Sequence, residues 1–435
     1  MEGNGLFSVD SVGEKVKVRN KVRTAVLKFV LPQFVLRLLG PRVCALIAGV
    51  QFDQNPPTSL SWIVLSRPIF DKDIEALEQN TDLSFTRVTR YMRLQSSWTP
   101  DAMRIQTFYQ GVVGRAAASA RHRNAVFART LISRVNRRRT VLGVISGNVD
   151  YWQDEGFKTI CSELDLPFVA LVKEHPLTAE ATRALEELFE TTGYRYKGTV
   201  ALVAGEASKR VFLSKGVCSE EKMIVTGLPR IDAWSSSDTE CEFQEKKSVT
   251  LLSFKTGYGA EHTFLEVLDE FVRVAGESRS HLRAPAFVIK AKDREDEEEI
   301  RRFVGPENKE LIHIVTDISL TELFASSSFV VGWGSMSLVE ACGAMKHLVI
   351  PNWGECANPA TSVFSHETHA ARFATFPASR TEFRRLLTDY IGSPPPAIPD
   401  GEAQEIMRQF VHLPVGQSIS GLVESVLGKI SSPAE

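Results

Sequence analysis

The stretch "FVVGWGSMSLVEACGAMKHLVIP", residues 329–351, changes its hydrophobic period abruptly at a short Gly/Ser segment. The apolar run before Gly332 predicts a buried strand, and the residues after it predict a helix that begins at Ser335 or Ser337. Leu338, Cys342 and Met345 recur at helical spacing and are expected to form the buried face of that helix. A residue two positions past Leu338 lies about 200° around a helix, so Glu340 is expected to point away from this face.

The turn between strand and helix, residues 332–337, has two interpretations. A Gly/Ser turn that opens a helix presents backbone N–H groups and the positive end of the helix dipole, which together favour an anion. Alternatively, Ser337 and Glu340 satisfy the S-x-x-E pattern of a capping box, in which the glutamate only reaches back to the helix N-terminus. The residues of the turn leave both interpretations open.

Short apolar runs alternate with helical patterns on both sides of this stretch. In the second half of the chain the strand-like runs are residues 248–254, 286–292 and 311–317. In the first half they are residues 61–66, 140–147, 167–172, 199–205 and 222–227. Buried strands that alternate with helices are typical of parallel βαβ units, so we expect an α/β protein with two Rossmann-like domains.

The length of 435 residues also predicts more than one domain, because single cores stop growing at about 250–300 residues. Residues 235–247 are polar and show no period, which is typical of a linker. The expected organisation is a basic amphipathic segment at 1–55 and an N-terminal domain at 56–234, then a linker at 235–247. A C-terminal domain follows at 248–400, with a helical tail at 401–435.

Three lysines follow predicted strands of the second half. Lys290 and Lys292 occupy alternate positions at one strand end, and Lys255 follows the strand that opens this half. The carboxyl ends of parallel strands meet at one edge of a sheet, so these cations would converge with the Gly/Ser turn. A diphosphate needs such a convergence, although lysines at strand ends can also be simply solvated.

Two segments resemble a known family. "ASKRVFLSKGVCSEEKMIVTGLPRID" (residues 207–232) and "DISLTELFASSSFVVGWGSMSLVEA" (residues 317–341) are similar to motifs of the GT-B glycosyltransferase superfamily. That superfamily holds the peptidoglycan GlcNAc transferase, the UDP-GlcNAc 2-epimerases and the CDP-glycerol glycerophosphotransferases. The likeness covers roughly residues 200–355. It departs from the epimerases at "NWGECANPA" and from the glycerophosphotransferases at "KEHP", where their "HG" motif is absent.

The resemblance implies two Rossmann-like domains facing a cleft, with a sugar nucleotide held mainly by the second domain. Glu340 would bind the ribose hydroxyls, and Lys290 and Lys292 would lie near the leaving group. The sugar nucleotide is then a substrate, and neither a cofactor nor a metal is expected. The residues that would take the diphosphate are those of the turn, Gly334, Ser335, Met336 and Ser337.

The catalytic base is expected in the first half, at the carboxyl ends of its strands. Asp154 and Glu155 follow the strand at 140–147, and His175 follows the strand at 167–172. An inverting displacement at a sugar carbon needs a general base for the acceptor hydroxyl, and these side chains can serve. A pair of acids at a helix N-terminus and a loop histidine are the structural alternatives.

Charged residues are distributed unevenly between the two parts of the chain. Residues 1–150 hold 22 Lys/Arg against 11 Asp/Glu, and the remainder holds 29 against 42. The basic half suggests an anionic partner, such as an anionic membrane met by residues 15–42, or these residues form a basic helix pair on their own domain. Nucleic acid is not expected, since the arginine-rich stretch 115–139 offers only Phe127 for base stacking.

The function expected from these features is a glycosyltransferase that moves a sugar from a nucleotide sugar to a surface polysaccharide or a glycolipid. A nucleotide-sugar epimerase or a CDP-glycerol-type glycerophosphotransferase of the same fold is the alternative. No uninterrupted apolar run reaches about 18 residues, and the six cysteines are scattered, as is typical of reduced thiols. The expected location is the cytoplasm, with peripheral contact to the inner membrane face.

Overall fold

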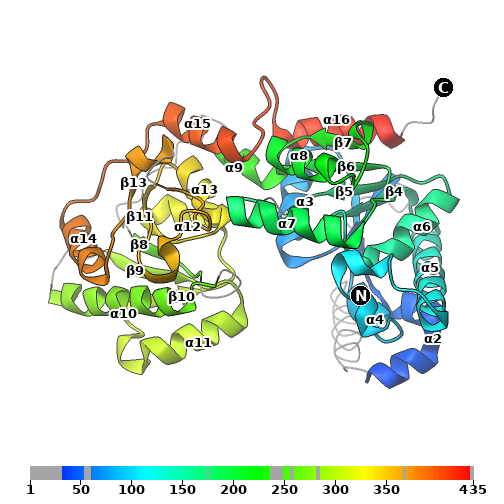
Figure 1. Ribbon diagram of the computed structural model, residues 1–435, viewed down its shortest axis with the longest axis horizontal. Coiled ribbons are helices and arrows are strands. Elements are labelled where there is room, and N and C mark those ends of the chain that lie inside the picture. The colour runs from blue at the N-terminus through cyan, green and yellow to red at the C-terminus, as the bar shows by residue number, and fades with distance from the viewer. Residues whose placement is uncertain are drawn as a thin grey trace, which may run out of the picture.

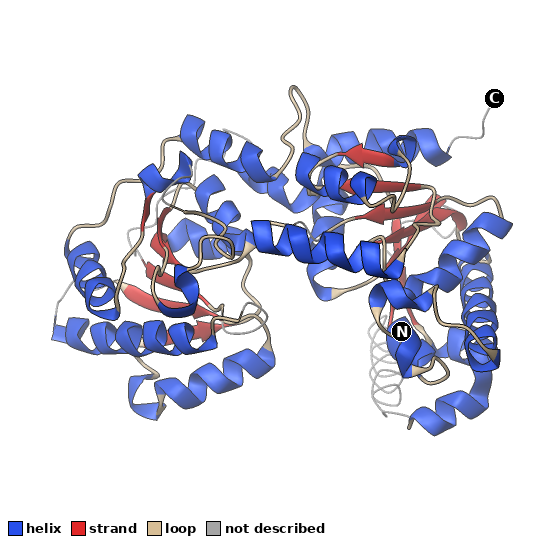
Figure 2. Cartoon of the chain, viewed as in Figure 1, coloured by secondary structure: helices blue, strands red, loops and turns tan. Residues whose placement is uncertain are grey.

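The computed structural model describes residues 32–52, 60–173, 176–235, 248–254, 259–280, 285–365 and 369–431. Its strands form two sheets, one built before residue 235 and the other after residue 247. Each sheet is flanked by helices (Figures 1 and 2). The expected α/β architecture with two Rossmann-like halves is therefore confirmed.

The first sheet has seven strands in the order β1-β3-β2-β4-β5-β6-β7. Only β1 runs antiparallel to its neighbour, and the other pairs are parallel. The strands are β1 (Gly49–Phe52), β2 (Leu60–Leu65), β3 (Phe85–Thr89), β4 (Thr140–Ser146), β5 (Phe168–Leu171), β6 (Val200–Val203) and β7 (Met223–Val225). The helices are α2 (Gln33–Ile47), α3 (Pro68–Asn80), α4 (Tyr91–Ser96), α5 (Arg115–Asn136), α6 (Glu155–Glu163), α7 (Ala179–Thr192) and α8 (Glu206–Ser214).

The second sheet has six parallel strands in the order β10-β9-β8-β11-β12-β13. The strands are β8 (Ser248–Leu252), β9 (Ala286–Lys290), β10 (Ile312–Val315), β11 (Ser327–Val331), β12 (His347–Val349) and β13 (Ala374–Thr375). The helices are α10 (Glu261–Glu277), α11 (Arg294–Val304), α12 (Leu320–Ser326), α13 (Met336–Gly343), α14 (Arg380–Gly392) and α15 (Asp400–Phe410). Renumbered within this half, the order is 3-2-1-4-5-6, the doubly wound arrangement of a Rossmann fold.

In strand β2, alternate side chains belong to two different hydrophobic clusters. Trp62 and Val64 belong to a large hydrophobic cluster that continues into the second half of the molecule. Ile63 and Leu65 belong to a separate cluster shared with α5 and α6. Successive side chains of a strand point to opposite faces, so a continuous apolar run indicates a strand buried on both faces.

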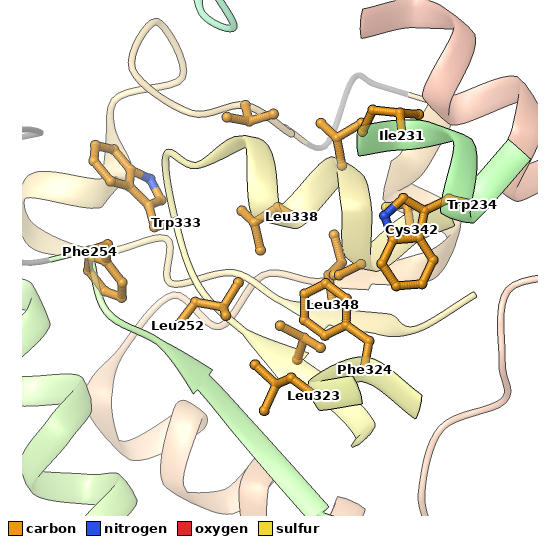
Figure 3. Packing of buried hydrophobic residues seen from close by; sticks show 14 of the residues in the cluster. Ile231, Trp234, Leu252, Phe254, Leu323, Phe324, Trp333, Leu338, Cys342 and Leu348 are labelled. Atoms are coloured by element: carbon orange, nitrogen blue, oxygen red, sulfur yellow. The ribbon is translucent and has the colours of Figure 1, made fainter. Parts of the chain in front are cut away.

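The segment between the sheets joins the two halves. The short helix α9 (Asp232–Ser235) follows the 3-10 turn η5 (Pro229–Ile231), and Ile231 and Trp234 lie beside Cys342 of α13 (Figure 3). The glycine at 343 permits this approach, since a Cβ there would lie 2.8 Å from the Cβ of Trp234. The large core cluster is thus continuous from one half to the other.

The C-terminal residues cross from one half to the other. Helix α15 lies against α13 in the second half, whereas α16 (Ile419–Ser431) lies against α3 and η5 of the first. Asp232 accepts hydrogen bonds from the N–H groups of Ile419 and Ser420, at 2.7 and 2.8 Å. This carboxylate therefore fixes the N-terminus of α16 to the segment that joins the sheets.

Helix α2 is the only described part of the basic segment expected at residues 1–55 that forms a helix. It bends at Gly40, where φ is 73°, and Pro41 follows. Phe34 and Leu38 are exposed on it, with relative exposures of 66% and 82%. No helix among the described residues is long and apolar enough to cross a membrane.

Candidate functional site

The Gly/Ser turn lies at the topological switch point of the second sheet. Strands β8 and β11 are neighbours at the centre of the sheet, and their crossovers leave in opposite directions, which opens a space at their carboxyl ends in folds of this kind. β11 ends at Val331, and α13 begins at Met336. Gly334 has a φ of 67°, in the left-handed region that favours glycine, and this conformation turns the chain from strand to helix.

The capping-box interpretation of this turn is wrong. The N-cap is Ser335, whose hydroxyl accepts a hydrogen bond from the N–H of Ser337 at 3.2 Å. Glu340 then lies in the second turn of the helix, too far along to reach back to the N-cap backbone. Ser335, Met336 and Ser337 are partly exposed, and the first-turn N–H groups of a helix have no partner within it.

Lys290 lies on the same sheet edge as this turn, with β8 between β9 and β11. It ends β9, and its Nζ donates to the carbonyl groups of Ala291 and Thr316, at 2.9 and 2.6 Å. Burial lowers the pKa of Lys290, and the positive charge of Lys72 lowers it further. Lys72 is an exposed residue of α3 in the first half, so its charge reaches Lys290 from the other half of the molecule.

The other two lysines expected at the diphosphate site are Lys292 and Lys255. Lys292 is exposed, and its backbone N–H donates to Asp296 at 2.8 Å. Lys255 lies outside the described residues. Among the described residues, Lys290 and Lys292 both lie at the carboxyl end of β9.

Glu340 points away from the apolar face of α13, as expected, but it is buried rather than open. Its exposed fraction is 6%, and its Oε1 lies 3.7 Å from Nε of Arg230. The side chain of Trp234 also forms a hydrogen bond with it. Burial raises the pKa of Glu340, while Arg230 and Lys72 oppose this shift.

Arg230 connects Glu340 to the first half of the chain. Its Nη1 lies 2.6 Å from Oδ2 of Asp73, and its backbone N–H donates to Oδ1 of the same carboxylate at 3.3 Å. Asp73 is fully buried on α3, and its pKa is raised by burial against the pull of Arg230. Asp73, Arg230 and Glu340 form a buried ionic chain, called here the interdomain triad, that joins α3 to α13.

The switch point of the first sheet lies between β2 and β4, where Arg67 and Asp154 meet. Asp154 is fully buried, and its Oδ2 accepts a hydrogen bond from the hydroxyl of Ser146 at the end of β4. Its Oδ1 lies 3.9 Å from Nη2 of Arg67 and has no hydrogen-bond partner among the described residues. Burial raises the pKa of Asp154, and Arg67 opposes this shift.

Glu155 is occupied on both oxygens. Oε1 lies 2.6 Å from Nζ of Lys158 and accepts from the hydroxyl of Tyr194 at 3.0 Å. Oε2 accepts from the side chain of Gln110 at 3.1 Å. This buried pair ties α6 to its neighbours, which gives Glu155 a structural role. The expected base His175 lies outside the described residues.

Sequence reasoning passed over Arg67, Lys72 and Asp73. All three stand in "SRPIFDKD", directly after the strand at β2, which is the signal that could have found them. Arg230 was within the quoted stretch 207–232 but carried no role. Ionised side chains at strand ends are ordinarily solvated. Only the tertiary structure shows that Asp73 is buried and that Arg67 and Arg230 are mostly buried, whereas Lys72 is exposed.

Among the residues that the structure describes, no group of three or more His, Cys, Asp or Glu side chains is arranged to hold a metal ion. The carboxylates of Asp154, Asp73 and Glu340 are instead paired with arginine side chains.

No family model matches the sequence, and no curated protein matches it. Among solved structures, the chain is similar to a variant of the wall teichoic acid polymerase TagF, with a TM-score of 0.51 and 10% identity, over 98% of this chain and 99% of that one. It also matches the UDP-GlcNAc 2-epimerase from Methanocaldococcus jannaschii (TM-score 0.45, 14% identity, 81% and 99% covered). A third match is the UDP-forming trehalose-phosphate synthase from Burkholderia vietnamiensis (TM-score 0.44, 14% identity, 86% and 99% covered). The first of these likenesses shows the GT-B fold that the sequence motifs implied.

Proposed function

We propose that this chain is a glycosyltransferase that moves a sugar from a nucleotide-sugar donor to a surface polysaccharide or a glycolipid. The observation that carries the proposal is the N-terminal turn of α13. It lies at the switch point of the second sheet, on the same sheet edge as Lys290, and the charge of Lys72 in the first half acts on both Lys290 and Glu340. A helix N-terminus with cations at the same sheet edge is suited to a diphosphate.

The donor would lie along this turn. Residues Gly334–Ser337 would hold the diphosphate through backbone N–H groups, and Lys290 would stabilise the charge that develops on the leaving nucleoside diphosphate. Lys292 would contribute at longer range, and Lys255 is proposed for the same group. In this proposal the chain's own cations balance the diphosphate charge, and no metal takes part. Glu340 remains the proposed ribose ligand, with its carboxylate held in place by Arg230 and Trp234.

In the reaction, an acceptor hydroxyl attacks the anomeric carbon, the bond to the diphosphate oxygen breaks, and a base takes the hydroxyl proton. Of the three proposed bases, Asp154 is favoured over Glu155, because one of its oxygens has no hydrogen bond among the described residues. Its raised pKa also suits a base. His175 stays a proposal. Replacing Asp154 by Asn should remove the acidic limb of the pH–rate profile, and an unchanged profile would exclude this role.

Nucleotide binding tests the donor site directly. Calorimetry with UDP, GDP, CDP and CMP should show that one nucleotide binds, and Lys290→Met should weaken that binding about tenfold, by loss of a charge-assisted hydrogen bond. Glu340→Gln should weaken it as well. The matched control is Lys309→Met, because Lys309 is an exposed lysine at the opposite, amino end of β10. Failure of all four nucleotides, or equal affinity in Lys290→Met and Lys309→Met, contradicts the proposed site.

The same panel separates the alternative functions. A CDP-glycerol-type glycerophosphotransferase would select CDP or CMP. A nucleotide-sugar epimerase would convert its nucleotide sugar without any acceptor, whereas a glycosyltransferase would release the nucleoside diphosphate only with an acceptor present.

Residues 15–42 are proposed to meet an anionic membrane surface peripherally, on the cytoplasmic side. The described part of this segment supports the proposal, because Phe34 and Leu38 are exposed beside the exposed Arg37 and Arg42. Co-sedimentation with vesicles that contain phosphatidylserine should exceed that with phosphatidylcholine alone, and Leu38→Glu should reduce it. Equal co-sedimentation of the variant would rule out this surface.

A further inference from the structure

Arg67 stands at the switch point of the first sheet as a positioned cation. It follows β2 and is the N-cap residue of α3. Its guanidinium carbon lies 3.4 Å from the ring centroid of Tyr151, so the plane of the group stacks on that ring. Nε donates to the hydroxyl of Tyr91 at 3.1 Å, and Nη2 donates to Gln153 at 3.1 Å.

This cation has no hydrogen-bonded counter-ion among the described residues. Its nearest carboxylate oxygen is Oδ1 of Asp154, at 3.9 Å, which is beyond hydrogen-bond distance. Its hydrogen bonds use Nε and Nη2, and Nη1 donates none to a described residue. The side chain is only 13% exposed, so water satisfies little of it. Arg67 is thus ion-paired with Asp154 without a hydrogen bond, and a mostly buried guanidinium in this state keeps donors that favour a further anionic partner.

We propose that Arg67 binds an oxyanion group, a carboxylate or a phosphate, on the acceptor of the transferred sugar. The planar guanidinium is fixed by Tyr151 and Tyr91, and Nη1 together with the second N–H of Nη2 matches the two oxygens of such a group. Oδ1 of Asp154, which has no hydrogen bond among the described residues, lies 3.9 Å from Nη2 of the same guanidinium.

The location relates this group to the acceptor rather than to the donor. Arg67 belongs to the first sheet, and the proposed diphosphate turn belongs to the second. The two are linked through α3, whose Lys72 acts electrostatically on both Lys290 and Glu340. Helix α3, which Arg67 caps, is therefore the element that connects the proposed acceptor group to the proposed donor site.

The inference rests on the proposed function, but its test does not depend on turnover. Saturation-transfer NMR would be recorded on the full chain with glucuronate, glucose 6-phosphate and glucose, each with the preferred nucleotide present. At least one anionic sugar should bind, and glucose should not. Binding of glucuronate alone identifies a carboxylate ligand, and binding of glucose 6-phosphate alone identifies a phosphate ligand.

Variants locate the binding. Arg67→Gln should weaken the anionic sugar at least about tenfold, and Arg67→Lys should weaken it less, because it keeps the charge but loses the bidentate geometry. Arg87→Gln is the matched control, since Arg87 lies on the same sheet with a side chain 19% exposed and pairs with Glu78. Should Arg67→Gln fail to fold, Arg67→Lys and the sugar panel still decide.

Three outcomes would overturn the inference. The first is equal binding of glucose and of both anionic sugars. The second is an anion affinity in Arg67→Lys and Arg67→Gln that equals the affinity in Arg87→Gln. The third is a loss of nucleotide affinity in Arg67→Gln as large as its loss of anionic-sugar affinity, which would assign Arg67 to the donor diphosphate. Failure of the proposed function is distinguishable, because it appears as absence of nucleotide binding in the unmodified chain.

Discussion

Buried ionisable side chains in this molecule have partners that the sequence does not reveal. Glu340 was expected to face a ligand, and its direction away from Leu338 and Cys342 is as helical periodicity predicts. What periodicity could not show is that Arg230, remote in the sequence, lies against it. Burial of a carboxylate is costly without such a pair, so the ionic partner explains why an acidic residue is tolerated there.

His347 provides a titration that can be followed at the scale of one residue. It is 8% exposed on β12, its Nε2 lies 2.9 Å from the hydroxyl of Thr375, and burial lowers its pKa to about 4. The unfolded chain binds this proton near pH 6.5. The contribution of neutral His347 to the free energy of unfolding is therefore fully present above pH 6.5. It should be lost between pH 6.5 and 4, which lowers the free energy of unfolding by up to about 3 kcal/mol.

Urea unfolding at several pH values checks this expectation. His347→Gln keeps a hydrogen-bonding side chain but cannot titrate, so it should flatten the slope between pH 4 and 6.5. His262→Gln is the control, since that side chain is 78% exposed. An equal slope in the His347→Gln variant and the unmodified chain would refute a buried neutral histidine.

At the scale of elements, sequence patterns located the strands and helices well. The run at residues 286–292 became β9, the run at 311–317 became β10, and the helical pattern at 294–303 became α11. These agreements have one cause, since strands buried on both faces are continuous apolar runs and their helices have one apolar face. The start of α13 was left between two serines, because either hydroxyl can cap a helix.

The roles of the strand ends depended on strand order, which the patterns did not supply. β8 and β11 are separated by two strands in sequence but are neighbours in the sheet, and this neighbourhood makes the Gly334 turn a switch point. The same holds for β2 and β4, which bring Arg67 to Asp154. Hydrogen bonding between strands that are remote in sequence determines both.

The interdomain triad is a property of the whole molecule, because its members come from α3, η5 and α13. Asp73→Asn should lower the free energy of unfolding by about 3 kcal/mol, since it leaves the buried Arg230 with one weaker partner. The double variant Asp73→Leu/Arg230→Met should recover most of this loss, because it removes both charges together. Urea unfolding measures each change.

A surface ion pair provides the control for this prediction. Asp101 pairs with Arg104, but its side chain is 91% exposed, so Asp101→Asn should change stability by less than about 0.5 kcal/mol. Equal unfolding midpoints for Asp73→Asn and Asp101→Asn would show that the triad does not stabilise the molecule.

The sequence by itself determined the α/β class, the two halves, and the strand–turn–helix at residues 329–343. These features depend on local periodicity and on turn residues, which act over a few positions. Only the tertiary structure decided that Glu340 is buried against Arg230, that Glu155 accepts hydrogen bonds from Gln110 and Tyr194, and that Arg67 is a positioned cation. The physical reason is that burial and pairing of charges depend on contacts between residues far apart in the chain, and no local pattern encodes them.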